Sequence, residues 1–510
     1  MKFLYPPGFN LKASLLRLSG FVLLCIYLLS ATASQELTTS STEKLKDVFW
    51  SPLTEFELST LSKVHLAQSA DPDALLALAI MASGNIRTTR EFNQIKSRIY
   101  QFIDRVKPLI SQQKNTWRKA FELHNAMHDE FFLANAPHTE LQGYKSDQSQ
   151  LSRVFSDKTY NCTSSALLYL ILARYFGLAV EAVILPSHVF VQLTLPTGQK
   201  LDIETTSKTG FGLRHDKAYY ENNNNLLENS EHWFRVRNLI PATYHDYVNR
   251  QVDSVYRLIA DNMNHQHLAA ERMAKVDRYR LQEVRSWLLP DDPQALLYRF
   301  YVFNNGLINL LQQKNNQQAI QLIAKAEILI QQYSKQMTAG SLLPTKKQQQ
   351  QIDSIITFIF TSKAGIAFSE DDYSAAIDHF TNALRWVREP EKSRKIMRNM
   401  VIAHVNQGNL FSRQKDYKLA INWYAKATAI LSEIAAVNNA VAVQDKQLKQ
   451  DLENNIGSAY WNMAVPYLNR GDSYTAHEIL GQCSRQFPSI EKCQQGLEKI
   501  CRTYALPVCQ

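Results

Sequence analysis

The apolar run from Thr163 to Phe176 constrains the fold of this chain more than any other segment. It is apolar almost all round, which predicts a buried helix, and Gly177 favours the left-handed conformation that commonly ends one. Small polar residues at 163–165 suit the first turn of a helix. They place Cys162 beside unpaired backbone amides and the positive end of the helix dipole, a position that favours the thiolate form of a cysteine.

Three strands and a turn are predicted after this helix. Residues 180–185 and 188–195 are rich in β-branched and aromatic side chains, which is typical of strands. Pro196-Thr197-Gly198 has the composition of a hairpin turn, and residues 201–204 then pair back along the second strand. The segment therefore predicts an α+β unit built around one apolar helix.

Three kinds of reactive side chain fall at fixed places in this unit. Cys162 begins the helix, His188 begins the second strand, and Asp202 and Glu204 share one face of the third because strand side chains alternate. In a thiol enzyme the imidazole takes the thiol proton, the carboxylate orients the imidazole, and helix-start amides receive the oxyanion. A single buried cysteine or a strand histidine is more often structural, so residue types alone leave both interpretations open.

A family resemblance favours the catalytic interpretation. The motif Asn-Cys-x-Ser-x-Ala-Leu-Leu-Tyr begins at Asn161, Pro-x-His-Val-Phe-Val begins at Pro186, and the acidic Glu204 precedes Thr-Thr. These motifs resemble the bacterial transglutaminase-like superfamily of papain-type cysteine enzymes, and the resemblance covers roughly residues 50 to 215, including a helical lead-in.

The resemblance implies that Cys162 is the nucleophile, His188 the base and Glu204 the third member. The usual third residue of the superfamily is Asp, and Asp202 is the alternative to Glu204. Such a site implies an acyl-transfer enzyme that works through a thioester, either a peptidase or amidase, or a transglutaminase-like enzyme. Some members lack the cysteine, so the alternative is a noncatalytic cell-envelope scaffold with an inactive core. Neither reading implies a cofactor or a metal.

The N-terminus predicts export. Basic residues precede a short apolar core at 20–29, and Ala31-Thr32-Ala33 has the Ala-x-Ala form of a cleavage site. Residues 1–33 are therefore predicted to be a secretory signal peptide cleaved after Ala33. The apolar core is short for a membrane span, so no span is expected after cleavage. We expect a periplasmic or secreted protein, and the alternative is an N-terminal membrane anchor that faces the periplasm.

The cysteines favour an oxidising compartment. Outside the signal segment the chain contains Cys162 and a C-terminal cluster made of Cys483, Cys493, Cys501 and Cys509. Four clustered cysteines in an exported chain predict two disulfides, which leaves three pairings open, although a local bridge from Cys483 to Cys493 is geometrically plausible. Cys162 is then the odd thiol, which is a liability in such a compartment unless it is buried or used.

The C-terminal part of the chain contains a repeated pattern. Residues around Ala376 recur at the same offsets around Ala420, part of the pattern returns at Ala476 and Leu480, and a weaker unit lies around Ala319. The pattern resembles the tetratricopeptide repeat, in which small residues let two helices approach closely. Stacked helix pairs commonly bind a protein or peptide partner, and the alternative is that they only brace the catalytic-type domain.

These patterns predict a division of the chain. After the signal peptide we expect a leader at 34–48, a transglutaminase-like (papain-like) domain at 49–240 with its core at 150–215, a helical connector with a degenerate repeat at 241–345, and tetratricopeptide-like repeats with the cysteine cluster at 346–510. After the polar loop at 221–225 only helical patterns follow. The predicted fold class is an α+β transglutaminase-like domain with a helical lead-in, followed by an all-α tetratricopeptide-type repeat domain.

Charge and motifs argue against several other classes of function. The net charge of +9 is modest for 510 residues, and basic residues are spread among acidic ones, so no nucleic-acid partner is expected. The sequence has neither a phosphate loop nor a dinucleotide fingerprint. His124 and His128 lie one helical turn apart, but no third ligand is evident, so we expect a solvated helix face there and no metal site.

Overall fold

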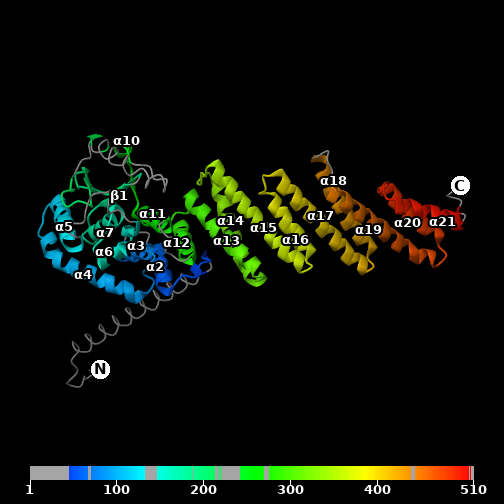
Figure 1. Ribbon diagram of the computed structural model, residues 1–510, viewed down its shortest axis with the longest axis horizontal. Helices are drawn as coiled ribbons and strands as arrows, with labels where there is room; N and C mark the ends of the chain where they lie inside the picture. The colour runs from blue at the N-terminus through cyan, green and yellow to red at the C-terminus, as the bar shows by residue number, and fades with distance from the viewer. Residues whose placement is uncertain are drawn as a thin grey trace, which may run out of the picture. The chain divides into compact units, whose positions relative to one another are not determined.

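A computed structural model of the chain (Figure 1) describes residues 45–46, 48–66, 71–132, 146–186, 188–212, 217–218, 220, 242–268, 275–437, 443–504 and 506. The predicted signal peptide, nearly all of the predicted leader, the polar loop at 221–225 and Cys509 lie outside the described residues. The chain forms two compact units, Met1–Val302 and Phe303–Gln510.

The first unit combines helices with one small sheet. Its elements are α2 (Glu55–Leu66), α3 (Pro72–Ala82), α4 (Thr89–Ser111), α5 (Thr116–Phe131), the 3-10 turn η1 (Ser146–Ser149), α6 (Leu151–Ser156), α7 (Cys162–Tyr175), β1 (Val180–Leu185), β2 (His188–Thr194), β3 (Lys200–Ile203), α10 (Tyr244–Val248), β4 (Val252–Asp253), α11 (Val255–Leu268) and α12 (Lys275–Leu288).

Helix α7 is the buried helix that the sequence predicts. Its residues from Thr163 to Ala173 are all buried, because helices and the sheet surround it. Gly177 follows its end with a φ of +66°, the left-handed conformation expected there. The helix therefore forms the centre of the core of the first unit, with Cys162 at its first position.

The predicted strands lie in a four-stranded antiparallel sheet with the order β3-β2-β1-β4, in which β2 and β1 are central and β3 is an edge strand. Gly198, with a φ of +82°, lies in the turn between β2 and β3, as predicted. Strand β4 corrects our expectation that only helices follow the polar loop. It has two residues, which is too short to leave a period-two pattern in the sequence.

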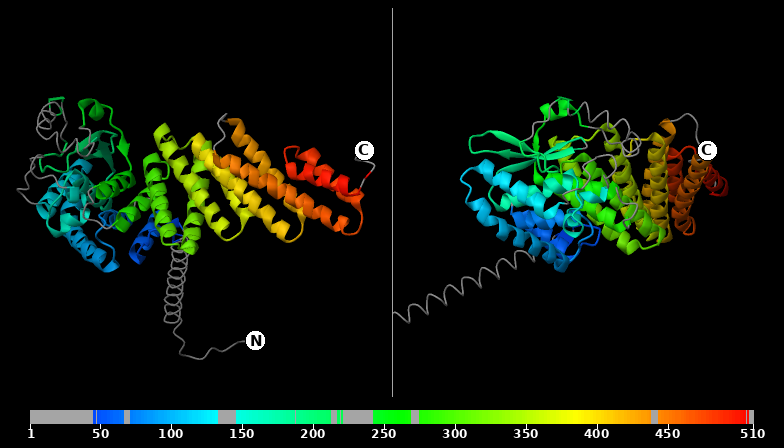
Figure 2. Two further views of the ribbon diagram at one scale, coloured as in Figure 1. Left: turned by 45° about the vertical axis from the view of Figure 1, so that its right-hand side comes forward. Right: turned by 60° about the vertical axis from the view of Figure 1, so that its left-hand side comes forward.

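The two faces of the sheet are covered by different parts of the chain. Val189, Val191 and Leu193 of β2 belong to the large core that contains α7. Phe190 points to the other face, where it packs in a smaller cluster with Tyr220 and Tyr247. In Figure 2 (right) the sheet accordingly lies between the green α10 segment and the blue and cyan helices.

The second unit is all helical among its described residues. Helix α13 (Pro293–Gln312) contains the boundary between the units, and it is followed by α14 (Asn316–Ala339), α15 (Lys346–Ser369), α16 (Tyr373–Leu384), α17 (Pro390–Arg413), α18 (Tyr417–Val437), α19 (Val443–Leu468), α20 (Ser473–Gln486) and α21 (Glu491–Tyr504). Figure 2 (left) shows α15 to α21 following one another in sequence order.

The same turn recurs between the helices of four successive pairs, α13/α14 to α19/α20. The first turn residue has a φ between +56° and +81°. The next residue caps the second helix with its side chain, and its amide donates to the carbonyl five residues earlier. The cap residues are Asn315, Asp372, Asp416 and Asp472. This recurrence confirms the predicted helical repeat and includes its weaker first unit.

Small residues allow the helices of a pair to approach closely. Ala376, Ala420 and Ala476 are fully buried, as the repeat pattern predicts. Gly408 of α17 has no room for a side chain, because a Cβ atom there would lie 2.5 Å from the ring of Tyr424 on α18. Each repeat thus depends on a side chain of minimal size at the contact between its helices.

Cysteines join the last two helices. Cys483 of α20 and Cys493 of α21 form a disulfide with their Cα atoms 5.9 Å apart, and Cys501 is also disulfide-bonded. Both Cys483 and Cys493 are fully buried, so this bridge lies inside the terminal helix pair. The C-terminal end of the repeat is therefore closed covalently.

Among the described helices, α15 alone is long and apolar enough to cross a membrane by length and composition. More than half of its most apolar stretch is buried in the structure, where its buried residues include Ile352, Ile356 and Ile359. The core helix of a repeat meets the same criterion, so this feature is weak support for a membrane span.

Candidate active site

Cys162 stands at the start of α7 as a free, partly buried thiol. Asn161 caps the helix, because its side-chain oxygen accepts hydrogen bonds from the amides of Thr163 and Ser164 at 3.0 and 3.2 Å. Those two amides are therefore not available for an oxyanion. Among the described residues nothing accepts a hydrogen bond from the Cys162 amide, so this amide is the helix-start donor that remains.

His188 connects the thiol to a carboxylate. Its Nε2 lies 2.7 Å from Oε2 of Glu204, and its ring also hydrogen-bonds the Cys162 side chain. Since Nε2 binds Glu204, Nδ1 is the ring nitrogen left for the thiol. The His188 side chain is 18% exposed and that of Glu204 is 6% exposed, so the pair is largely shielded from water. The structure thus brings together the three residues that the sequence singled out.

The charges of this pair support each other. Burial alone lowers the pKa of His188, but the negative charge of Glu204 and the hydrogen bonds with Cys162 and Glu204 outweigh burial and raise the pKa well above its ordinary value. Burial alone raises the pKa of Glu204, but the charge of His188 and hydrogen bonds from His188 and Thr206 lower it to about 2. An imidazolium and a carboxylate therefore face each other at neutral pH.

Thr206 and Gly210 hold the Glu204 carboxylate in place. The amide and hydroxyl of Thr206 both donate to Oε1 of Glu204, at 3.1 and 2.6 Å, which leaves Oε2 for His188. The Glu204 amide donates to the Gly210 carbonyl at 3.0 Å. A Cβ atom on Gly210 would lie 2.2 Å from the Glu204 carbonyl oxygen, so the loop can close this tightly only with glycine.

Asp202, the alternative third member, has other partners. Its carboxylate accepts hydrogen bonds from Gln192 at 3.1 Å, from the hydroxyl of Tyr247 at 2.7 Å and from Arg250 at 2.8 Å. It therefore attaches the α10 segment to β3, and it does not contact the imidazole. Of the two acids, Glu204, which directly follows β3, is the one that contacts His188.

Helix α7 and the Glu204 segment are attached directly to each other. The hydroxyl groups of Ser165 and Thr205 lie 2.8 Å apart in a buried hydrogen bond. The hydroxyl of Tyr160 donates to the Thr206 carbonyl at 3.3 Å, and burial raises the pKa of Tyr160 to about 12. These contacts fix the distance between the Cys162 thiol and the Glu204 carboxylate, which belong to elements far apart in the sequence.

His124 and His128 correct one of our expectations. The structure places both histidines of α5 in the interior, with exposures of 0% and 7%, instead of on a solvated helix face. Their rings lie 4.6 Å apart, and His124 also packs edge-on against Tyr169 and Phe211. Among the described residues no group of three or more potential ligands is placed to hold a metal ion.

Sequence reasoning missed Thr206, Gly210 and His124 as parts of the site. Thr206 belongs to the Thr-Thr pair that follows Glu204, and its donation to the carboxylate follows from a local Asx-like geometry. Gly210 carries a sequence signal only in being a glycine close after a strand. His124 comes from a helix about eighty residues away, so no local pattern connects it to Glu204.

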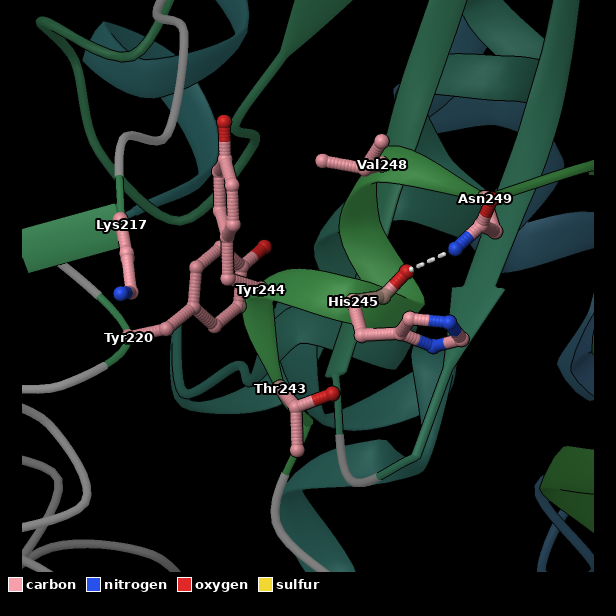
Figure 3. Close-up of a pocket in the computed structure, with 7 residues that line it drawn as sticks. All are labelled: Lys217, Tyr220, Thr243, Tyr244, His245, Val248 and Asn249. Carbon is pink, nitrogen blue, oxygen red and sulfur yellow. Dashed lines mark hydrogen bonds between the residues drawn. The ribbon is translucent and has the colours of Figure 1, made fainter.

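A separate pocket of about 470 Å³ lies beside α10. Its wall consists of Lys217, Tyr220, Thr243, Tyr244, His245, Val248 and Asn249 (Figure 3). The polar groups of two lining residues are used inside α10, since Asn249 donates to the His245 carbonyl and Thr243 binds Asp246. None of Cys162, His188 and Glu204 lines this pocket, so it is distinct from the candidate active site.

The fold and the site define a transglutaminase-like class of domain, with a thiol at a helix start, a histidine at the start of β2 and a carboxylate directly after β3. Residues 93–228 match the sequence profile of the Transglutaminase-like superfamily, a range that includes Cys162, His188 and Glu204. The first unit therefore contains a transglutaminase-like domain, and helical repeats follow it, which confirms the predicted fold class.

Two solved structures of helical assemblies show only distant similarity to the chain. The crystal structure of the APC/C hetero-tetramer Cut9-Hcn1 has 12% identity, covers 87% of this chain and 75% of that one, and has a TM-score of 0.13. The crystal structure of yeast Tom70 has 9% identity, covers 93% and 96%, and also has a TM-score of 0.13. At such TM-scores neither likeness is informative about this protein. No curated protein matches the chain.

Proposed function

We propose that the protein is an exported, cysteine-dependent acyl-transfer enzyme whose catalytic residues are Cys162, His188 and Glu204. The observation that carries this proposal is the position of His188, which hydrogen-bonds the Cys162 thiol while its Nε2 lies 2.7 Å from a buried carboxylate. A structural histidine needs one satisfied partner, whereas a base needs both a nucleophile and an orienting acid.

The proposed reaction follows from the roles of these groups. Before attack the thiol proton is held on Nδ1 of His188, and Glu204 stabilises this imidazolium. The sulfur of Cys162 forms a bond to the carbonyl carbon of an amide or ester, and the Cys162 amide donates to the oxyanion. As the intermediate collapses, the carbon–nitrogen or carbon–oxygen bond breaks and His188 gives its proton to the leaving group. A thioester remains.

A second nucleophile then releases the acyl group. His188 takes a proton from water or from a primary amine, which attacks the thioester carbon and returns the thiol. Water gives a carboxylic acid, as in a peptidase or amidase, and an amine gives a new amide, as in transglutamination. We favour hydrolysis because water is present at far higher concentration than any amine.

Export is supported by the cysteines and by the N-terminal sequence. A buried disulfide between Cys483 and Cys493 persists in oxidising compartments such as the periplasm. The basic and apolar residues before Ala33 have the order of a signal peptide. We propose that the chain lacks a membrane span after cleavage, with α15 serving as a core helix of the repeats.

The repeats are proposed to bind a protein or peptide. They expose large apolar side chains, among them Ile328, Leu343 and Tyr474 with exposures of 52%, 81% and 58%. The same observation favours a second candidate function, a noncatalytic envelope scaffold in which the transglutaminase-like core and the repeats only bind partners.

The rate of alkylation of Cys162 by iodoacetamide against pH separates the two candidates. We expect fast labelling of the wild type well below the pH at which an ordinary thiol ionises, and a loss of this low-pH reactivity in His188→Ala. Cys162→Ala provides the labelling blank, because the other described cysteines are disulfide-bonded. If the wild-type protein is folded and its labelling rate rises only at the pH where a free thiol ionises, the proposed enzymatic function is contradicted and the scaffold function is favoured.

A further inference from the structure

His124 is buried in an unusual state. Its side chain is fully excluded from solvent, yet neither ring nitrogen has a hydrogen-bond partner of standard geometry among the described residues. A buried polar group without a partner is costly, and in native proteins such groups commonly have a functional reason. Phe or Leu would fill the same space without this cost, so packing alone does not explain a histidine at this position.

The main chain of Glu204 is a polar neighbour of the His124 ring. Burial lowers the pKa of His124 to about 4, and this effect is opposed by interaction with the Glu204 backbone and with its charge. The other titratable or charged groups that face the ring are Lys208, which also disfavours the imidazolium, His128 on the same helix, and Tyr169 on α7. His124 is therefore neutral at physiological pH and carries one N–H donor.

The opposite side of Glu204 is also closed. Gly210 packs against the carbonyl oxygen and Cβ atom of Glu204, so the main chain of Glu204 lies against His124 and the Gly210 loop. The carboxylate then extends to His188, which it meets at 2.7 Å. A small displacement of this main chain would move the carboxylate by a similar amount, because the Glu204 side chain has few rotamers open to it in a buried site.

We propose that His124 is a positioning residue for this site, and this proposal rests on the proposed function. The neutral imidazole of His124 donates a hydrogen bond to the main-chain carbonyl of Glu204. This hydrogen bond fixes the segment from which Glu204 orients His188. His124 does not touch the substrate or the thiol. It acts through Glu204, and it remains uncharged so that it stabilises the carbonyl without competing with His188 for the carboxylate.

The test uses three substitutions of His124 in the full-length mature protein. His124→Leu keeps the volume and removes the donor, whereas His124→Asn and His124→Gln carry amide donors near the positions of Nδ1 and Nε2, respectively. His128→Leu is the matched control, because His128 is buried on the same helix one turn away. Two readouts are measured, namely the titration of His188 by NMR of ¹³C-labelled histidine and the alkylation rate of Cys162 at pH 6.

We expect His124→Leu to lower the pKa of His188 and to slow alkylation by on the order of 10- to 100-fold, the usual effect of a displacement near 1 Å at a reacting group. At least one amide variant should restore both readouts, and His128→Leu should leave both at the wild-type values. A wild-type His188 titration in His124→Leu overturns the proposal. So does a loss in both amide variants as large as that in His124→Leu, since the role of His124 is then one of packing.

Folding and function are separated by the same design. If His124→Leu does not fold, the amide variants His124→Asn and His124→Gln decide. A wild-type titration of His188 in either variant supports the proposal, and a lowered pKa of His188 in both variants overturns it. If wild-type Cys162 labels like an ordinary thiol, the proposed function fails. The titration of His188 still tests the positioning of Glu204 in that case, because it depends on the carboxylate and not on turnover.

Discussion

Substitution of Gly210 by Ala tests whether the tight loop after β3 sets the position of Glu204. The backbone of Gly210 is not in the left-handed region, so its φ alone does not require glycine. The space does, because a Cβ atom would lie 2.2 Å from the Glu204 carbonyl oxygen and 2.7 Å from the Glu204 Cβ atom. Neither of these atoms belongs to the far end of a flexible side chain, so the main chain itself must move.

The size of the effect follows from these distances. A relaxed contact needs roughly 3.4 Å, so the loop and Glu204 must separate by about 1 Å. Overpacking of this kind costs about 1–3 kcal/mol of folding free energy. It also weakens the hydrogen bond of 2.7 Å between Glu204 and His188, and we expect alkylation of Cys162 at pH 6 to fall by up to about 100-fold.

The assay combines urea unfolding, followed by tryptophan fluorescence, with the alkylation rate of Cys162. Gly365→Ala in α15 is the control, because a Cβ atom there meets nothing within 4 Å. That change should stabilise the protein by about 0.5–1 kcal/mol and leave alkylation unchanged. If Gly210→Ala has the stability and the alkylation profile of the wild type, the loop does not position Glu204 and the reasoning is wrong.

Three further predictions concern Glu204, His124 and the repeats. Glu204→Gln should abolish the low-pH alkylation of Cys162, whereas Asp202→Asn should retain it. Asp202→Asn should instead lower the unfolding free energy by about 1–3 kcal/mol, because a charged hydrogen-bond network is lost. Alkylation rates and urea unfolding curves of the two variants check both outcomes. Burial lowers the pKa of His124 from 6.5 to about 4, so as the pH falls the unfolded chain protonates this histidine before the folded chain does. The free energy of unfolding should therefore fall by about 3 kcal/mol between pH 6.5 and 4. Urea unfolding measures this loss, which His124→Leu should lack. Gly408→Ala should destabilise the repeats by about 1–3 kcal/mol, because its Cβ atom would overlap the ring of Tyr424, and it should not change the alkylation rate. A lower alkylation rate would show that the substitution also alters the candidate active site.

Local patterns in the sequence were sufficient for the elements that carry the site. The apolar run after Asn161 predicted α7, and the β-branched and aromatic residues on either side of Pro186 predicted the strands, with Gly198 in the turn. These features depend on residues a few positions apart, whose contacts are fixed by the geometry of a helix or a strand. The repeat was visible for the same reason, since each helix pair is a local unit.

The choice between two acids required the register and the third dimension. Strand alternation placed Asp202 and Glu204 on one face, and it made either of them able to meet His188. In the structure Asp202 pairs with Gln192, and its carboxylate binds Tyr247 and Arg250 of the α10 segment. These partners hold Asp202 away from the imidazole of His188. Their different roles depend on what packs beside each of them, and the spacing along the strand does not contain this information.

The sequence by itself thus determined the helix that presents Cys162, the hairpin that presents His188, and the helical character of the second unit. Only the tertiary structure decided that Glu204 is the acidic residue that contacts His188, that the amides beside Cys162 are used by the cap, and that His124 is buried beside Glu204. The physical reason is that side-chain periodicity reports which residues share a face, whereas burial and pairing depend on which distant segment covers that face.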